Sequence, residues 1–567
     1  MTPTRILGTL LAAVALLAAA PLHAQPATAG YAVSSTHLAG EHRPSVLADG
    51  LGGAFIGYKL DYRSVTAPAE ILVSHVQPWG ARYPEWGTLP LAPAGSLAQA
   101  NPTGLARVVL APQGKALAFA DLTNGSGTAD VVRRVETDGA DPSYPGFKST
   151  YSYNTLAVAQ RSDGGALVMS KTPGSTNCLA TVITAAGAGT EVLNDLAVGA
   201  SWQAQLGGDQ MTAVPSGTDG AIATLLFLQL QGALDGGTDI VAVRIDGSGH
   251  ELWHRVVTQA LRDQTDVVST TDGADGIIMA WRDQRTSANG ADVYAQRLLS
   301  TGAAATGWLV GGKAIAALAG SDQLAPTIAP DDAGGAWIAW VDGRDLATTD
   351  NDIYFTHVLA NGAFAAGFPS GGKVLCNALG SQSAVRVARD GNGGLFAVWL
   401  DARDGEQDLY GQHVDSAGNV TANWQANGSP LCTDPTPQIE AAIGWVSNGR
   451  AIAAWSDQRG GDNAVYALTL DAATVTLGVP AGSSSRLALA PRKNPSRRGI
   501  ELMLDASGAG DVRVALLDVS GRRLAEQTIV GPGHAAPVRF QGVRPGLYFV
   551  TAARGGERAS VRVAVVE

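Results

Sequence analysis

Three observations predict an all-β fold in which a β-propeller is followed by a small β-sandwich. First, one phrase recurs four times, as IIMAWRDQR, WIAWVDGRD, FAVWLDARD and IAAWSDQRG. Second, the aligned tryptophans, Trp281, Trp340, Trp399 and Trp455, are 59, 59 and 56 residues apart, and fixed periods of this size are typical of propellers and solenoids. Third, each copy divides into four short apolar segments joined by turns, without helical periodicity.

Fainter copies lie upstream, with Tyr58, Phe119, Ser170 and Leu225 at the tryptophan position. Together they give eight copies between Tyr58 and Trp455, each about 57 residues long. Because the second to fourth copies are degenerate, seven blades is the alternative count. Turns such as DGLGG (49–53), DDAGG (331–335) and DGNGG (390–394) join the first two strands of a copy, since glycine adopts positive φ without steric cost.

The start of the mature chain predicts how the ring closes. Residues 31–55 align with 313–337, where the outer strand of one copy leads into the next copy. We therefore expect residues 31–36 to complete the eighth blade, within a propeller spanning residues 31–471. Closure would remove two exposed sheet edges that favour aggregation.

The first 24 residues have the pattern of a secretory signal peptide. Arg5 precedes an apolar run from Ile6 to Ala20, and Ala24 offers a small residue at the cleavage site. A retained membrane anchor is the alternative, but the run is short for a membrane span and no later stretch is long enough. This predicts a protein secreted or displayed at the outer cell surface, with no transmembrane segment after signal removal.

Composition narrows the class of partner. The formal net charge is −11 and no basic stripe is present, which argues against nucleic acid. Cys376 and Cys432 occupy equivalent places in consecutive copies, farther apart than the roughly 7 Å between Cα atoms that a disulfide tolerates. We expect buried free thiols, and no zinc-type spacing is present.

A different unit follows a linker at 472–485. Residues 486–567 alternate apolar and polar positions in segments such as GIELMLDA and SVRVAVVE, a pattern that predicts a compact β-sandwich. Several positions carry a more specific motif: Asn494, Pro495, Asp518, Gly521, Arg522, Gly546 and Tyr548.

With these residues, the segment resembles the C-terminal sorting domain of the type IX secretion system and the related Ig-like domain of flagellar hook-cap proteins. The resemblance implies an Ig-like sandwich, recognition by a type IX-like secretion machinery, and passage across the outer membrane of a Gram-negative-type bacterium. One departure is RFQG at 539–542, where such domains often carry a Trp-Asp-Gly-like segment.

The recurring aromatic and charged residues are interpreted as structural. A tryptophan can fill the space between blades, and aspartate and arginine two residues apart can pair on one face of a strand. Sugar-stacking platforms and an arginine-built anion site are the alternatives, but a functional site normally breaks repeat symmetry and these residues obey it. The set is Asp61, Arg63, Trp281, Asp283, Arg285, Asp292, Trp340, Asp342, Arg344, Asp352, Trp399, Asp401, Arg403, Asp408, Trp455, Asp457 and Arg459, with Asp292, Asp352 and Asp408 as candidate partners of the arginines.

The sequence assigns no catalytic, cofactor or metal site. Asp390 with Asn392, and residues 350–352, carry oxygen atoms that suit calcium, but neither completes a DxDxDG-type loop. Residues 332–337 match the tail of the Asp-box turn of sialidase propellers once, with Pro330 where serine or threonine belongs.

The predicted function is that of an exported binding or adhesion propeller for an extracellular glycan or protein. The polar loops at 286–291 and 346–351 are the candidate surface, because loops on rigid scaffolds commonly carry binding. One alternative is a sialidase-like glycoside hydrolase or a lyase acting on extracellular polysaccharide. That alternative requires two carboxylates outside the repeat pattern, about 5–10 Å apart. Another is a structural cell-envelope protein.

Overall fold

Every regular element in the part of the chain that the computed structural model describes is a β-strand. The structure describes residues 30–33, 40–61, 70–78, 89–90, 101–102, 107–111, 115–124, 127–136, 139–140, 147–148, 156–171, 177–184, 186, 188–196, 202–204, 211–229, 237–286, 290–459, 463–473, 487–491, 496–497, 499–506, 511–518, 522–530, 536–554 and 557–566. The expected signal peptide (1–24) and most of the linker (472–485) lie outside these residues. Within them, no helix is long and apolar enough to cross a membrane.

Eight antiparallel sheets of at least four strands make up the first unit. Blades one to four consist of β2 to β5 (Gly40–Ala48, Ala54–Asp61, Glu70–Val76, Leu89–Pro90), β6 to β11 (Asn101–Pro102, Arg107–Ala111, Lys115–Asn124, Gly127–Glu136, Gly139–Ala140, Phe147–Lys148), β12 to β15 (Leu156–Gln160, Ala166–Lys171, Asn177–Ile183, Gly189–Asp195) and β16 to β20 (Trp202–Ala204, Thr212–Ser216, Gly220–Gln229, Thr238–Ile245, Glu251–Thr258). Blades five to eight consist of β21 to β24 (Gln264–Thr271, Ile277–Asp283, Asp292–Leu298, Lys313–Ala316), β25 to β28 (Gln323–Pro330, Ala336–Asp342, Asp352–Val358, Lys373–Cys376), β29 to β32 (Gln382–Arg389, Leu395–Asp401, Asp408–Val414, Ser429–Cys432), and β33 to β35 with β1 (Gln438–Ser447, Arg450–Asp457, Ala464–Asp471, Tyr31–Ala32).

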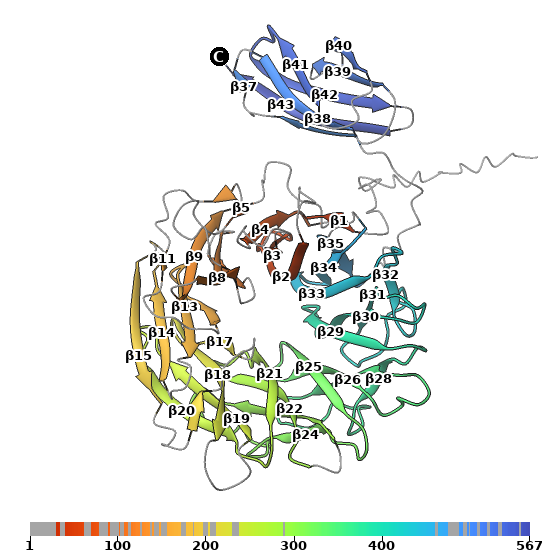
Figure 1. The fold of residues 1–567 in the computed structure, drawn as a ribbon. Coiled ribbons are helices and arrows are strands. Elements are labelled where there is room, and N and C mark those ends of the chain that lie inside the picture. Colours follow the sequence, from red (N-terminus) through yellow and green to blue (C-terminus); the bar gives the residue numbers. More distant parts are fainter. Residues whose placement is uncertain are drawn as a thin grey trace, which may run out of the picture.

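These sheets form a closed ring (Figure 1). The innermost strands contact one another in the order β2, β7, β12, β17, β21, β25, β29 and β33, and β33 contacts β2 again. The described residues therefore contain eight blades, and the predicted propeller is confirmed with the higher of the two counts.

The chain start completes the last blade, as the sequence alignment predicts. β1 is the outer strand of blade eight and pairs antiparallel with β35, with Tyr31 opposite Ala467 and Ala32 opposite Tyr466. The Val33 amide extends this ladder by donating to the Val465 carbonyl at 2.8 Å. Residues 34–36, the rest of the predicted strand, lie outside the described part.

A glycine that precedes the outer strand lets that strand lie close to the blade's tryptophan. Gly30, Gly312, Gly372 and Gly428 all have positive φ, and a Cβ atom on any of them would stand 2.3–2.5 Å from the ring of Trp455, Trp281, Trp340 or Trp399, respectively. Gly30 thus does for blade eight what an internal glycine does for each of blades five to seven.

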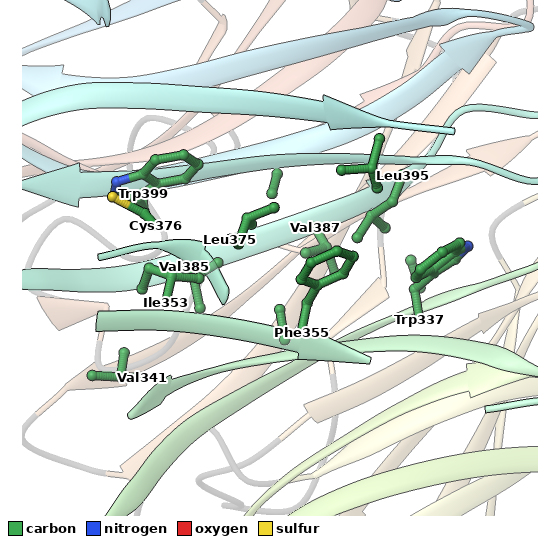
Figure 2. Packing of buried hydrophobic residues seen from close by; sticks show 14 of the residues in the cluster. Trp337, Val341, Ile353, Phe355, Leu375, Cys376, Val385, Val387, Leu395 and Trp399 are labelled. Carbon is green, nitrogen blue, oxygen red and sulfur yellow. The ribbon is translucent and has the colours of Figure 1, made fainter. Parts of the chain in front are cut away.

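The core lies between neighbouring blades (Figure 2). Between blades six and seven, Trp337 and Phe355 from one sheet pack with Val387 and Leu395 of the next in a single buried cluster. Trp281, Trp340, Trp399 and Trp455 are all fully buried. Burial of a large aromatic ring in every regular blade explains why the tryptophan period is the strongest signal in the sequence.

The C-terminal unit is a β-sandwich, as predicted. One sheet has the order β36-β38-β41 and the other β37-β43-β42-β39-β40. The strands are β36 (Leu487–Pro491), β37 (Ser496–Arg497), β38 (Gly499–Ala506), β39 (Val512–Asp518), β40 (Arg523–Ile529), β41 (Ala536–Gln541), β42 (Gly546–Arg554) and β43 (Glu557–Val566). Alternate residues of both sheets, such as Leu502 and Val514, form one buried core between them.

Replacing Gly30 by alanine tests the ring closure. We expect Gly30→Ala to lower the free energy of unfolding by about 1–3 kcal/mol more than Gly50→Ala, because the new Cβ overpacks against Trp455. Gly50 is the matched control, since it also has positive φ but a Cβ there meets nothing within 4 Å. Equal losses in urea unfolding would show that the contact with Trp455 does not stabilise the ring.

Candidate functional site

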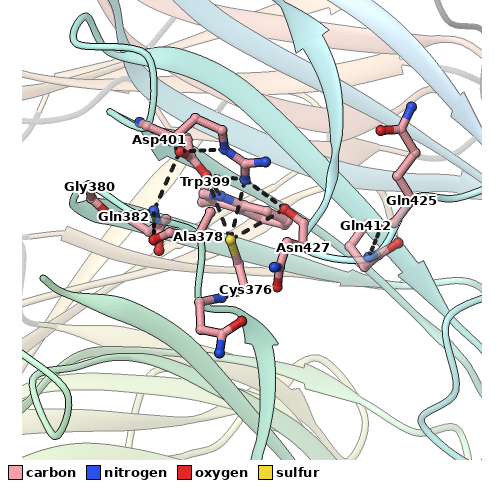
Figure 3. Close-up of polar contacts among 11 residues, drawn as sticks. Cys376, Ala378, Gly380, Gln382, Trp399, Asp401, Gln412, Gln425 and Asn427 are labelled. Carbon is pink, nitrogen blue, oxygen red and sulfur yellow. Dashed lines mark hydrogen bonds and ion pairs between the residues drawn. The ribbon is translucent and has the colours of Figure 1, made fainter. Parts of the chain in front are cut away.

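A buried aspartate organises one end of each of blades five to eight. Asp283, Asp342, Asp401 and Asp457 are fully buried at the ends of their strands. In blade seven, Asp401 accepts a hydrogen bond from Trp399 Nε1 at 2.8 Å and from Gln382 Nε2 at 3.4 Å (Figure 3). The indole contacts of Asp283, Asp342 and Asp457 measure 2.8, 2.7 and 3.2 Å.

An arginine two residues later in the sequence forms an ion pair with each aspartate. Arg344 reaches Asp342 through Nε at 2.9 Å and Nη2 at 2.6 Å, and its guanidinium lies 3.7 Å from the centre of the Tyr354 ring. Its Nη2 also donates to the Gly371 carbonyl at 2.7 Å. Arg285 and Arg403 make the same aspartate and tyrosine contacts, and Arg459 contacts Asp457 through Nη2 and lies over the Tyr466 ring. These guanidinium groups are occupied within the scaffold and are not arranged as an anion site.

The three candidate partners of the arginines lie elsewhere than the sequence suggested. Asp292, Asp352 and Asp408 stand directly opposite Asp283, Asp342 and Asp401 in the sheet register, so that carboxylates face carboxylates. Each arginine hydrogen-bonds the aspartate on its own strand, because the two-residue spacing lets the guanidinium fold back onto it. Asp61 pairs in register with Gly40, and the contacts of Arg63 lie outside the described residues.

The cysteines are free and buried, as expected. Cys376 Sγ lies 3.7 Å from Asp401 Oδ2 and 3.4 Å from Arg403 Nη2, so the outer strand of blade six touches the aspartate of blade seven. Burial raises the pKa of both Cys376 and Cys432 to about 12. Neither thiol is a nucleophile at neutral pH, because nucleophilic attack requires the thiolate.

A second buried network at the opposite end of the blades is absent from the sequence interpretation. Asp331 accepts the Ala333 and Gly335 amides, each at 2.8 Å, while its other oxygen meets His357 Nε2 at 2.9 Å. Burial opposes ionisation, but these hydrogen bonds outweigh it and leave the pKa of Asp331 lowered. The same pattern recurs at Asp49 with His75, at Asp390 with His413, and at Asp272 with Arg297. The sequence pattern that could have predicted this network is a histidine or arginine 23–26 residues after each turn aspartate.

The loops at the tryptophan end of blades five to eight are strongly acidic. We define the acidic rim as residues 259–263, 283–292, 317–322, 342–352, 377–381, 401–408, 433–437 and 457–459, which join second to third strands and one blade to the next. It contains fourteen aspartates and glutamates against five arginines. The candidate loops 286–291 and 346–351 belong to it, although residues 287–289 lie outside the described part. Leu346 is 59% exposed there.

Blade seven breaks the repeat within this rim. Its loop from Asp401 to Asp408 is three residues shorter than the loop from Asp342 to Asp352. Asp408 is only 8% exposed. Burial, followed by the charges of Asp404, Asp401, Asp434 and Glu406, raises the pKa of Asp408 to about 6.

The sandwich carries a groove of about 690 Å³ between two open sheet edges. β40 borders the groove from the edge of the five-stranded sheet, and β41 borders it from the edge of the three-stranded sheet. The motif residues Asp518, Arg522 and Tyr548 line it, together with Arg539 and Arg544. Gly546 begins β42 beside it, whereas Asn494, Pro495 and Gly521 lie outside the described residues.

Metal ligands do not gather in the part of the chain that the structure describes. No three histidine, cysteine, aspartate or glutamate side chains there form a group that could hold a metal ion. The calcium alternative for Asp390 has a structural explanation instead, since one carboxylate oxygen binds the turn amides and the other His413.

No protein-family model matches this chain, and no curated protein matches it either. Among solved structures, it is similar to the polysaccharide lyase Uly1, with TM-score 0.39 and 10% identity over 70% of this chain and 93% of the lyase. It is also similar to an α-L-arabinofuranosidase of Fusarium graminearum, with TM-score 0.31 and 13% identity over 56% of this chain and 93% of that enzyme. The alignment with the acylaminoacyl peptidase of Pyrococcus horikoshii has TM-score 0.35 and 10% identity over 70% of this chain, but spans only 58% of the peptidase. Likeness this distant carries no functional argument.

Replacing one arginine of the repeat network distinguishes a structural role from a binding role. We expect Arg344→Met to lower the free energy of unfolding by about 3–5 kcal/mol, because it leaves buried Asp342 without its cation. The control Arg450→Met removes the half-exposed pair with Asp471 and should cost less than about 1 kcal/mol. If Arg344→Met loses little stability in urea unfolding, the structural role is contradicted and Arg344 becomes a candidate for ligand binding.

Proposed function

We propose that this protein is an exported or surface-displayed propeller that binds an extracellular partner through its acidic rim. The observation that carries the proposal is the division of charged groups in blades five to eight. The repeated aspartates and arginines are hydrogen-bonded to each other inside the scaffold, whereas the rim loops differ in length and sequence from blade to blade. A rigid ring with variable, exposed loops suits recognition.

The charge of the rim restricts the partner class. Fourteen carboxylates against five arginines repel polyanions, so sulfated or uronic acid-rich polymers are poor candidates. Neutral glycans and neutral or basic proteins remain in keeping with this surface.

Export forms the second half of the proposal. The C-terminal sandwich would be recognised by a type IX-like secretion machinery through the groove between β40 and β41. Two features support this assignment: the motif residues Asp518, Arg522 and Tyr548 all line the groove, and both bordering strands are sheet edges. An open edge strand can accept an extended segment of another protein.

A glycoside hydrolase or lyase acting on extracellular polysaccharide is the second candidate. It is favoured by Asp408, a buried carboxyl group whose pKa is raised to about 6 beside the exposed Asp404. A carboxyl group with a raised pKa can act as the general acid in the cleavage of a glycosidic bond, and a second carboxylate on the same loop could assist it.

One experiment compares these functions. The mature chain is screened against glycans and extracellular proteins while released sugar is assayed in parallel. For a binding protein we expect saturable binding without turnover, and about tenfold weaker binding for Leu346→Ser, since this exposed leucine would be buried on binding. Leu309→Ser is the matched control, because Leu309 is equally exposed in the loop at the opposite end of blade five.

Three outcomes would contradict the binding proposal. Released sugar that disappears in Asp408→Asn would replace it by the hydrolase or lyase candidate. Equal losses for Leu346→Ser and Leu309→Ser would place binding away from the acidic rim. Absence of both binding and turnover would favour a structural role in the cell envelope.

The groove variant Arg544→Glu tests export. In a bacterium with a type IX system, we expect full-length Arg544→Glu to accumulate in the periplasm, because the change reverses a charge in the groove. Arg513→Glu changes an exposed arginine on β39 outside the groove lining, and this variant should reach the surface normally. Normal surface display of both variants, measured by protease accessibility, would contradict recognition through this groove.

A further inference from the structure

We propose that the acidic rim binds a basic protein, and that one lysine or arginine of that partner enters the corner of blade seven with Asp408 as its innermost acceptor. The blade seven corner consists of Asp401, Asp404, Glu406, Asp408 and Asp434. The inference rests on the proposed binding function and names the chemical class of its partner.

Asp408 is a buried carboxylate without a cation or hydrogen-bond donor of its own. It is 8% exposed, and no described residue donates a hydrogen bond to it or forms an ion pair with it. The equivalent Asp352 in blade six accepts a hydrogen bond from Thr349 of its own loop at 2.9 Å. The shorter loop of blade seven has no threonine at all and carries Glu406 instead. Blade seven therefore lacks an internal donor that blade six has.

The one arginine in the blade seven corner, Arg403, already binds groups of the scaffold. Arg403 donates to Asp401 at 2.9 and 2.6 Å and to the Asn427 carbonyl at 2.6 Å, and it lies 4.0 Å from the centre of the Tyr410 ring. Asp434 lies in the connection to blade eight, and its carboxylate accepts hydrogen bonds from the amide and the hydroxyl of Thr436. A buried carboxylate beside further carboxylates costs free energy unless a cation reaches it.

A side-chain cation of a protein fits this corner better than a metal ion. The described carboxylates form no group that could hold a metal ion. The ammonium group of lysine or the guanidinium group of arginine needs only one buried carboxylate as acceptor and a negative electrostatic potential around it. The field extends over the rims of four blades, where acidic residues outnumber arginines by fourteen to five. Such a wide surface suits the steering of a basic protein.

Binding at this corner should be coupled to proton release. Asp408 has a raised pKa of about 6, caused first by burial and then by the neighbouring carboxylates, so that part of the population is protonated in mild acid. A bound cation favours the ionised form, and affinity must therefore fall as pH drops below about 6, by up to tenfold per pH unit for one proton. Of the other groups at this end of the blade, Tyr410 has a pKa raised to about 12. His413 lies at the far end of β31, hydrogen-bonded to Asp390 and Thr421.

The test measures binding of fluorescent oligolysine to the mature full-length chain at low salt, from about pH 7.5 to about pH 5. We expect affinity to fall about tenfold over this range for the natural sequence. Asp408→Asn should bind several-fold more weakly at neutral pH and lose most of the pH dependence. Asp163→Asn is the matched control: it removes one carboxylate from an exposed turn of blade three and should leave both quantities unchanged.

Each alternative outcome is decisive. An equal pH dependence in Asp408→Asn, with the thermal midpoint retained, overturns the role of Asp408. If that variant fails to fold, Glu406→Gln serves instead, and an unchanged affinity for it overturns the corner as the binding site. A stronger, Asp408-dependent affinity for chitosan oligomers would replace the basic protein by an amino sugar polymer. If the rim binds another ligand but not oligolysine, only this inference is rejected. If no ligand binds at the rim, the proposed function is rejected as well.

Discussion

The regular half of the ring depends on one interaction, the buried aspartate that follows each tryptophan. In blade seven, Asp401 receives donors from its own strand, from the following loop and from the inner strand, and it contacts the thiol on the outer strand of blade six. A buried carboxylate is tolerated only when its lone pairs are filled and its charge is balanced. The same group that fixes the loop geometry therefore also links one blade to its neighbour.

The sequence was sufficient for the parts of the fold that repeat. Tryptophans at a constant period mark the second strands because each must fill equivalent space between blades. The pairing of residues 31–33 with blade eight could be predicted because Tyr31 occupies the place of Lys313 in the alignment. The aspartate–histidine pairs were missed because turn glycines fully explained DDAGG and DGNGG without any partner from the third strand.

The candidate site was harder to predict for a physical reason. In the sequence interpretation, Asp292, Asp352 and Asp408 were candidate partners of the arginines. The structure instead places them directly opposite Asp283, Asp342 and Asp401, and these three aspartates pair with the arginines. Whether the remaining carboxylate of blades six and seven receives a hydrogen bond depends on loop length and on single residues such as Thr349, which donates to Asp352. The groove between β40 and β41 depends on which strands end up at sheet edges, and spacing along the chain does not determine this.

These constraints separate the residues that can evolve function from those that cannot. Withdrawing Arg344 to bind an anion would leave Asp342 buried and uncompensated, at a cost of several kcal/mol that a surface ligand rarely returns. A position such as Asp408 has no internal partner to lose, so an external cation lowers the free energy of the scaffold while it binds. Most buried carboxylates of the regular blades already bind internal donors. A carboxylate that lacks such a donor can therefore bind an external cation without the loss of an internal contact. In blade seven the loop is three residues shorter than in blade six and supplies no donor to Asp408, which makes Asp408 such a carboxylate.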